Sequence, residues 1–265
     1  MPFAAAIFES CVMAARRGAM IHRERERDKE FHFQDWFQRR LAETSIEFEQ
    51  GGRNSYPDFR LVRSPEGYEV KGLGYPGRSA DYDSNSQAPC GHHNGREIYY
   101  VFGRYPSNPD GDSYPVIDFV MCHGRFLNAT EGYLHKNRSF RGFGSYGDIM
   151  IRDRKMYVAP TPFALVDGTV HRRTLIVPEG EAVPPTLEMI GTLNRRESDE
   201  IVGAYTFDFR TNELGTRKIA NPHPGRQHRF VAYRLGDDPP YRVTMRNQRE
   251  VLADLGSPVH PDDDG

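Results

Sequence analysis

The sequence contains few cysteines and little net charge, and each shortage narrows the class of protein. Its 265 residues include three cysteines, Cys11, Cys90 and Cys122. These are too few and too scattered for a disulfide framework, so a reducing compartment is expected and the cytoplasm is the predicted location. The formal net charge is −2. A surface for a polyanion would therefore have to be local, with arginines segregated from acids.

The sequence also lacks a long apolar run and an internal repeat. The apolar stretch at the start is interrupted by Glu9 and followed by Arg16 and Arg17. It is too short and too charged to span a bilayer, and it lacks the basic beginning of an export signal. No membrane association is expected, and the length suits one large domain.

The hydrophobic pattern changes character near Pro57. Before it, residues 3–20 favour a helix, and an apolar stripe at spacings of three and four predicts an amphipathic helix over 31–49. After it, short apolar segments alternate with Pro, Gly, Asn and Asp, which predicts strands. Weak helical patterns return at 185–193 and 248–255. The fold class expected is α/β (α+β), a mixed β-sheet flanked by helices with additional C-terminal β-structure.

Two adjacent strands place polar side chains on one face. Asp58 opens the first strand, and Glu69 and Lys71 lie on the second. Because side chains alternate along a strand, Asp58 shares its face with Arg60, and Glu69 shares its face with Lys71. The opposite face of both strands is apolar, which suits it for covering a core.

The turn between these strands sets their register. A turn over residues 63–66 would place Asp58 opposite Lys71 and make Glu69 its diagonal neighbour, with Cβ atoms roughly 7–8 Å apart. A slip by one residue would turn the acids into the core, so core burial and site geometry select compatible pairings.

Two carboxylates and a lysine are suited to metal-assisted cleavage of a phosphodiester. Hard carboxylate oxygens bind Mg²⁺, which retains waters and has room for a phosphate oxygen. Such an ion polarises phosphorus and lowers the pKa of a bound water. Lys71 can orient the attacking water and offset charge in the transition state. The same pattern also fits a Pro-Asp turn before a surface strand.

In these residues the chain resembles the PD-(D/E)XK nuclease superfamily, and more narrowly its type II restriction endonucleases. The likeness rests on Pro57-Asp58, Glu69-Val70-Lys71, the loop DYDSNSQAPCG and the strand EIYYVFGRY. The resemblance implies a restriction-endonuclease-like core, Mg²⁺ held by Asp58, Glu69 and the Val70 carbonyl, and Lys71 as the catalytic lysine. Site-specific cleavage of double-stranded DNA that leaves 5′-phosphates is the implied activity.

Further features follow from the same resemblance. Some members add an acid from the preceding helix, for which Glu43, Glu47 and Glu49 are the candidates. A homodimer is expected because twofold symmetry matches a palindromic site. A companion DNA methyltransferase is implied, although not as a stable subunit. The single nuclease domain, 1–265, would comprise an N-terminal extension or helix (1–27), a catalytic core (28–160) and a β-rich part for DNA recognition or dimerisation (161–265).

Polar and basic side chains outside this centre are candidates for DNA contacts. Short amide and hydroxyl groups can touch phosphates or base edges, and arginine reads guanine and grips phosphates. The candidates are Ser84, Asn85, Ser86, Gln87, Arg138, Arg141, Arg152, Arg154, Arg226 and Arg229.

Two alternatives to a restriction enzyme remain open. A repair, mobile-element or junction nuclease would use the same chemistry. A non-catalytic β-rich binding module is the second, with zinc held by soft ligands drawn from Cys90, His92, His93, Cys122 and His123. Paired CxxC spacing, which would strengthen a zinc assignment, is absent.

Overall fold

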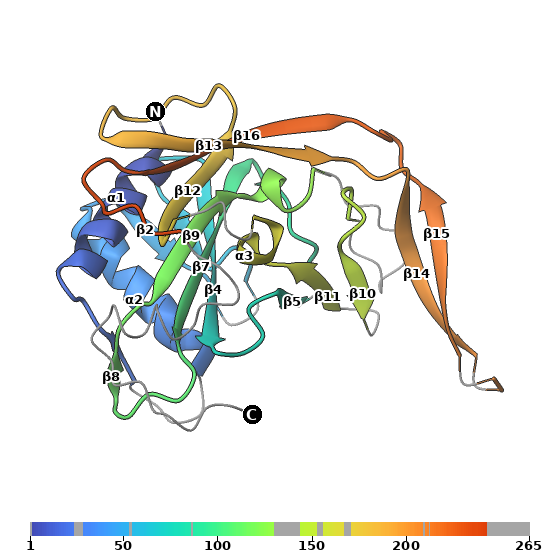
Figure 1. The fold of residues 1–265 in the computed structure, drawn as a ribbon, viewed down its shortest axis with the longest axis horizontal. Helices are drawn as coiled ribbons and strands as arrows, with labels where there is room; N and C mark the ends of the chain where they lie inside the picture. Colours follow the sequence, from blue (N-terminus) through green and yellow to red (C-terminus); the bar gives the residue numbers. More distant parts are fainter. Residues whose placement is uncertain are drawn as a thin grey trace.

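A large mixed β-sheet organises the chain in this computed structural model. The structure describes residues 2–23, 29–52, 55–85, 87–129, 144–152, 156–166, 171–208, 210–211 and 213–242. Within these ranges the protein is mixed α/β, with three α-helices and a nine-stranded sheet (Figure 1).

The central sheet combines parallel and antiparallel pairs. Its path runs through β13 (Leu187–Arg196), β16 (Gln227–Leu235), β12 (Arg173–Pro178), β9 (Asp118–His123), β7 (Arg96–Pro106), β4 (Glu66–Tyr75), β3 (Phe59–Leu61) and β2 (Phe48–Gln50), with β6 (His92–His93) also pairing with β7. The pairs β4–β7 and β9–β12 are parallel, and the other neighbours are antiparallel.

Smaller elements surround this sheet. They are a three-stranded sheet of β5 (Asp81–Asn85), β10 (Met150–Arg152) and β11 (Met156–Pro160), a pair of β1 (Ile21–His22) and β8 (Ser113–Tyr114), the helix α3 (Pro162–Leu165), the 3-10 helix η1 (Gly124–Phe126), and a ribbon of β14 (Glu200–Asp208) and β15 (Glu213–Ala220). The ribbon extends away from the rest of the chain at the right of Figure 1.

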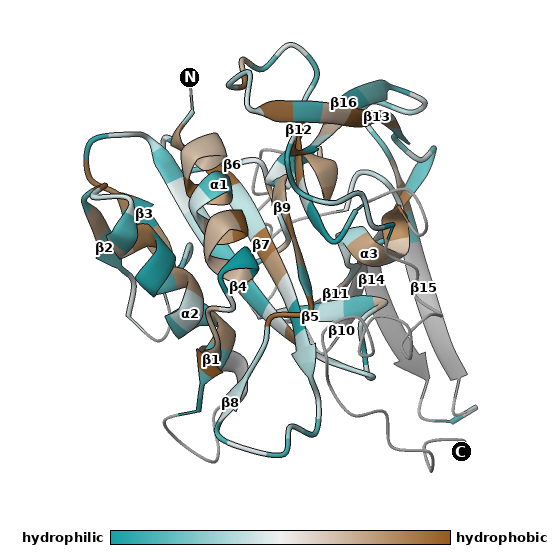
Figure 2. Cartoon of the chain, turned by 60° about the vertical axis from the view of Figure 1, so that its left-hand side comes forward, coloured by the Kyte–Doolittle hydropathy of each residue, from teal (hydrophilic) through white to brown (hydrophobic). Residues whose placement is uncertain are grey.

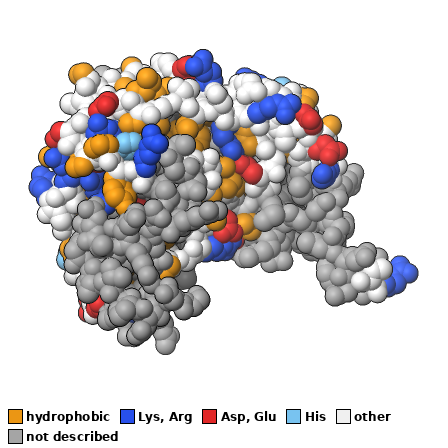
Figure 3. Space-filling model, in the orientation of Figure 1, with side chains coloured by type: hydrophobic (Ala, Val, Ile, Leu, Met, Phe, Trp, Pro, Cys, Tyr) orange, Lys and Arg blue, Asp and Glu red, His pale blue; other side chains and the backbone are white. Residues whose placement is uncertain are grey.

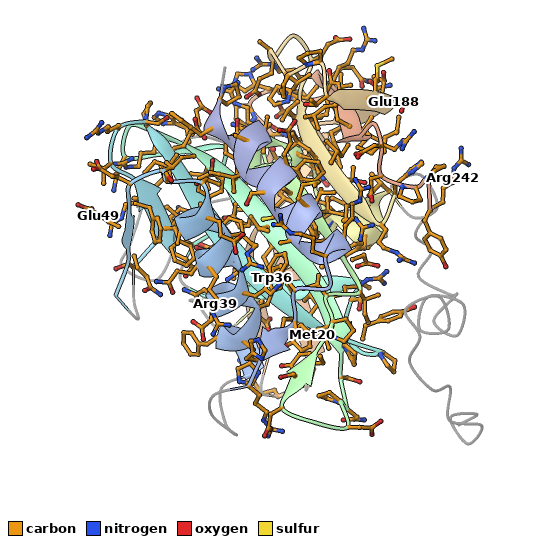
Figure 4. The ribbon with its side chains drawn as sticks, turned by 90° about the vertical axis from the view of Figure 1, so that its left-hand side faces the viewer. Met20, Trp36, Arg39, Glu49, Glu188 and Arg242 are labelled. Atoms are coloured by element: carbon orange, nitrogen blue, oxygen red, sulfur yellow. The ribbon has the colours of Figure 1, made fainter. Side chains whose placement is uncertain are left out.

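Two long helices, α1 (Phe3–Arg16) and α2 (Lys29–Glu43), cover one face of the sheet (Figures 1 and 2). The stripe predicted for α2 is buried, since Phe33, Trp36 and Phe37 are at most 1% exposed. Figure 4 shows Trp36 turned toward the sheet and Arg39 turned away. Gly103 on β7 permits this close approach, because a Cβ there would lie 2.0 Å from the Phe33 ring.

The opposite face is covered mainly by β-structure. Tyr82 from β5, Tyr157 from β11 and Phe163 from α3 belong to the same core cluster as Tyr100 and Phe102 of β7. The expectation of a mixed sheet with further C-terminal strands is confirmed. The long helices, however, lie on only one face, and a restriction-endonuclease-like core remains a prediction.

Three expected helices need correction or lie outside view. The helix predicted over 31–49 ends at Glu43, where Thr44 donates a hydrogen bond to the Leu41 carbonyl and Ser45 adopts a positive φ. Residues 185–193 contribute to β13 rather than a helix, because pairing along β16 satisfies their backbone. The segment 248–255 lies outside the described residues.

The register of the β3–β4 hairpin differs from the prediction by two residues. Phe59 pairs with Tyr68 and Arg60 with Gly67, so continuing the ladder sets Asp58 opposite Glu69 rather than Lys71. The connection is 62–65, one residue earlier than expected. Since the shift is even, every side chain keeps its predicted face.

Glu66 explains the earlier turn. Its carboxylate accepts hydrogen bonds from the backbone N–H groups of Phe3 and Ala4, at 2.9 and 3.1 Å, and from the Tyr68 hydroxyl at 2.6 Å. It thereby satisfies N–H groups at the start of α1 that have no partner within the helix. This buried contact holds Glu66 inside β4, so it cannot belong to the turn.

Within the described residues, no helix combines the length and apolar character needed to cross a membrane.

Replacing Glu66 should therefore loosen α1 from the hairpin. We expect Glu66→Gln to lower the free energy of unfolding by about 2 kcal/mol, because an amide cannot accept all of these hydrogen bonds. Urea denaturation measures the change. The control Glu188→Gln removes an exposed carboxylate paired with Arg234 and should cost less than about 1 kcal/mol. Equal effects from both variants would contradict this role.

Candidate active site

The predicted catalytic side chains come together at the open end of the β3–β4 hairpin. Asp58 directly precedes β3, and Glu69 and Lys71 lie on the face of β4 that points away from α1 and α2. Val70, between them, packs into the helix-side core at 4% exposure. Burial of Val70 thus orients its two polar neighbours.

Asp58 is fixed to the adjacent strand by its own side chain. Its Oδ2 accepts a hydrogen bond from the Val70 N–H at 2.8 Å. A strand residue directs its N–H and C=O toward the same neighbouring strand, so the Val70 carbonyl lies on the Asp58 side as well. The Asp58 carboxylate and the Val70 carbonyl therefore lie on the same side of β4, beside Glu69. That these groups share a metal ion stays a prediction.

Glu69 and Lys71 form a largely buried ion pair. The Lys71 Nζ lies 2.8 Å from Glu69 Oε1, and the lysine side chain is 14% exposed. Glu69 as a residue is only 8% exposed. Its second oxygen, Oε2, is buried and accepts no hydrogen bond from any described group. Buried carboxylate oxygens normally have partners, so Oε2 is suited to receive a ligand.

Tyrosine rings form an apolar wall beside Glu69. Tyr100 of β7 is aligned with Glu69, its hydroxyl lies 2.9 Å from that of Tyr56, and Tyr82 packs on it with ring centroids 6.4 Å apart. Burial foremost, with the Glu69 carboxylate contributing, raises the pKa of all three tyrosines well above the ordinary value. The hydroxyls stay neutral, and the wall lowers the local dielectric around Glu69.

The donor set at this site fits a hard divalent cation. Two carboxylates and one peptide carbonyl offer only oxygen ligands, and Mg²⁺ typically completes its shell with waters and substrate phosphate. The buried, unpartnered Glu69 Oε2 supports the fit. Protein side chains alone do not build a closed cage, since the described residues contain no group of three or more His, Cys, Asp or Glu placed to hold a metal.

The three candidate helix acids occupy different places. Glu43 lies on α2, on the far side of the sheet, and pairs with Arg40 at 2.7 Å. Glu47 follows α2 and pairs with Arg63 at 3.0 Å. Glu49 lies on β2 opposite Arg60, at the outer edge of the sheet (Figure 4). Glu49, directly opposite Arg60, shares the face of Asp58, but from an exposed position one strand away.

The polar residues after β4 are mostly enclosed. Ser84, 4% exposed, donates its hydroxyl to the Gln87 carbonyl, and the Gln87 amide contacts Cys90 and His93 at 3.5 Å. Ser84 and Gln87 are therefore buried near Tyr56, where they form hydrogen bonds within the protein. They do not lie on the surface, where DNA could contact them. The Asn85 side chain and Ser86 lie outside the described residues.

The candidate arginines are remote or outside view. Arg226 is exposed, and Arg229 pairs with Glu179 at 3.1 Å. Arg226 directly precedes β16 and Arg229 lies on it. Three strands of the sheet separate β16 from β4. Arg138, Arg141, Arg154 and the Arg152 side chain lie outside the described residues. On the face in Figure 3, basic side chains of the described part are interspersed with acidic ones.

The suggested zinc ligands are not gathered into one site. Cys122 points into the core cluster opposite the helices, whereas His123, the next residue, is aligned with Tyr99 and lies 2.6 Å from Glu97 through Nε2. Successive strand residues face opposite sides of a sheet, so Cys122 and His123 cannot share an ion. Cys90 contacts Tyr56 at 3.5 Å. A zinc site built from this set is therefore not supported.

His92 and His93 form the short strand β6 beside β7. His93 stacks edge-on against Tyr56 with centroids 5.0 Å apart and lies 3.0 Å from the Asn94 amide. Burial, and then the neighbouring His92, lowers the pKa of His93. This histidine borders the tyrosine wall.

No family model, curated protein or solved structure matches this chain.

Sequence reasoning missed Tyr56, Tyr82 and Tyr100. The two-residue period places Tyr100 on a definite face, but only the parallel alignment of β4 with β7 brings it beside Glu69. Tyr82 reaches the site because β5 packs over the sheet. Local sequence carries no signal for either pairing.

Removing one partner of the Glu69–Lys71 ion pair should lower the free energy of unfolding. Removing both partners together should have little effect on it. We expect Lys71→Met alone to lose about 2–4 kcal/mol, because Glu69 is left charged and buried. The double variant Glu69→Gln, Lys71→Met should return to within about 1 kcal/mol of wild type or exceed it. Urea unfolding compares them, with Glu200→Gln, Lys218→Met as an exposed-pair control. If the double variant were as unstable as Lys71→Met, the ion pair would itself be needed for stability, contrary to this expectation.

Proposed function

We propose that the chain is a type II site-specific deoxyribonuclease that hydrolyses double-stranded DNA with Mg²⁺ and leaves 5′-phosphates. Asp58, Glu69 and the Val70 carbonyl would hold the ion, and Lys71 is the catalytic lysine. A homodimer in the cytoplasm would cut both strands of a short palindrome.

One observation carries this proposal. Two carboxylates and a lysine lie together on one face, while one buried oxygen of Glu69 has no partner among the described residues. A strand with a purely structural role does not need a buried carboxylate oxygen without a hydrogen bond. Functional sites, in contrast, commonly retain energetically unfavourable groups of this kind. The family resemblance supplies the specific activity.

The residues have separable tasks. Mg²⁺, when bound, supplies Lewis-acid polarisation of the phosphate. Asp58 and Glu69 fix its position, and the hydrogen bond from Val70 holds Asp58 in place. Lys71, kept at the site by Glu69, orients the attacking water and offsets charge that develops on phosphate oxygens. The tyrosine wall limits water on the core side of Glu69.

Asp58 is the residue to change in a test of the metal site that does not depend on activity. We expect millimolar Mg²⁺ to raise the melting temperature of wild type, since a ligand at a hundredfold its dissociation constant adds about 2.7 kcal/mol. The isosteric Asp58→Asn variant should show a much smaller rise, because it keeps the contact with Val70 but loses the charged ligand. Thermal unfolding with and without Mg²⁺ measures both. Equal shifts would place the cation elsewhere.

Lys71 is the residue to change in the test of catalysis. Wild type incubated with a plasmid and Mg²⁺ should give discrete fragments, and a chelator should abolish them. Lys71→Ala should slow cleavage by about 10²–10⁴-fold while DNA binding persists. Lys218→Ala, which alters an exposed lysine, is the matched control and should cut normally.

The products distinguish the alternatives. Random or structure-dependent nicking would indicate a repair, mobile-element or junction nuclease of the same chemistry. DNA that stays intact under all conditions would indicate a non-catalytic binding module. Full activity in Lys71→Ala would show that another group performs the lysine's task.

A further inference from the structure

Arg60 is half-buried, and its side chain forms no ion pair with any residue that the structure describes. It lies on β3, where its backbone pairs with Gly67 on one side and Glu49 on the other. Its Nε is buried and unpartnered, and no hydrogen bond or ion pair joins the Arg60 side chain to any described residue. Glu49 shares its face across the ladder, yet the two side chains form no ion pair.

The Arg60 Nε is shielded from water and has no replacement partner among the described residues. This state is unfavourable for a group that carries charge. Guanidinium groups match phosphate oxygens in a planar, two-pronged arrangement. An anion from outside the chain would therefore supply the hydrogen-bond acceptor and the opposite charge that the Arg60 side chain lacks among the described residues.

Arg60 shares the face of the candidate active site. Asp58 and Arg60 are two residues apart on one strand, so their side chains point the same way at a separation of roughly 7 Å. In the ladder Arg60 is the diagonal neighbour of Glu69. An anion bound by Arg60 would lie within one phosphate-sized step of the two carboxylates.

A groove lies at the turn of the β3–β4 hairpin. It has a volume of about 370 Å³ and is lined by Val62, Arg63, Ser64, Pro65, Asn94, Gly95 and Arg96. By strand alternation, Val62 and Arg96 point to the same side as Arg60. Two further guanidinium groups thus border the path that leads away from Glu69.

The two groove arginines are held differently. Arg96 Nη1 donates to the carbonyls of Leu61, Ser64 and Glu66, at 2.8–3.3 Å, which fixes its position. Arg63 pairs with Glu47, and both side chains are more than half exposed. Exposed pairs of this kind contribute little, so Arg63 can exchange its carboxylate for another anion.

We propose that Arg60 binds a backbone phosphate of DNA next to the one cleaved, and that the strand continues over the groove at Arg63 and Arg96. This assignment rests on the proposed nuclease function for its choice of anion. It makes Arg60 a substrate-positioning residue, one that fixes the phosphodiester relative to Asp58 and Glu69 without taking part in bond cleavage.

Binding to a fluorescent mixed-sequence DNA duplex tests the proposal without cleavage. The full chain is measured in Ca²⁺, another oxygen-binding cation, at several salt concentrations, and the DNA is checked for integrity. Arg60→Gln should weaken binding by about ten- to hundredfold, as expected for a lost charged hydrogen bond. The slope of log affinity against log salt should become shallower by about 0.9, the value for one phosphate contact.

Three further variants isolate the cause. Arg60→Lys keeps the charge and should retain the wild-type salt slope with weaker binding. Arg63→Gln should weaken binding less than Arg60→Gln does, because Arg63 is exposed. Arg17→Gln, at the exposed end of α1 on the helix side, should leave both affinity and slope unchanged. Melting temperatures establish that each variant is folded, and Arg60→Gln should melt no lower than wild type because it removes a half-buried charge that no described residue pairs with.

The outcomes separate this proposal from the nuclease assignment. Unchanged affinity and slope in Arg60→Gln, with active cleavage by wild type, overturn the Arg60 assignment alone. Weaker binding with a shallower slope, in a wild type that never cuts DNA, supports Arg60 and contradicts the nuclease. Weaker binding with an unchanged slope overturns a phosphate contact, and wild type without affinity for DNA overturns the phosphate proposal as well.

Discussion

The alternation of side chains along β4 is the constraint on which the site depends. Tyr68 and Val70 are held in the core beneath the helices, so Glu69 and Lys71 must project from the other face. A displacement by two residues preserves this division, and a displacement by one would turn both charges into the core beneath the helices. Core packing on the helix side therefore selects which side chains form the site on the other face, as firmly as any contact between the polar groups themselves.

The two faces of the sheet are closed in different ways, and this asymmetry shapes the site. The helix side is sealed by apolar stripes of α1 and α2, whereas β5, β11 and α3 cover the opposite face. Glu69 lies beside the tyrosine wall, where that covering reaches β4. One carboxylate thus has an aromatic, low-dielectric flank.

Sequence patterns predicted what depends on local periodicity. The stripe of α2, most strands and the shared face of Asp58, Glu69 and Lys71 all follow from periods of 3.6 and 2. The hairpin register was wrong because it depends on Glu66 meeting the start of α1, 62 residues away. Helix expected at 185–193 is strand for a similar reason, since β16 supplies its partner from a distance. Such pairings leave no trace in a single local window.

The backbone amide of Val70 donates its hydrogen bond to a side chain. Its proton is held by a carboxylate rather than by a main-chain carbonyl, although it belongs to an interior strand of the sheet. The exchange rate and chemical shift of one backbone amide therefore register where the Asp58 carboxylate points. Any event that draws that carboxylate away should change the nuclear magnetic resonance signal of the Val70 amide.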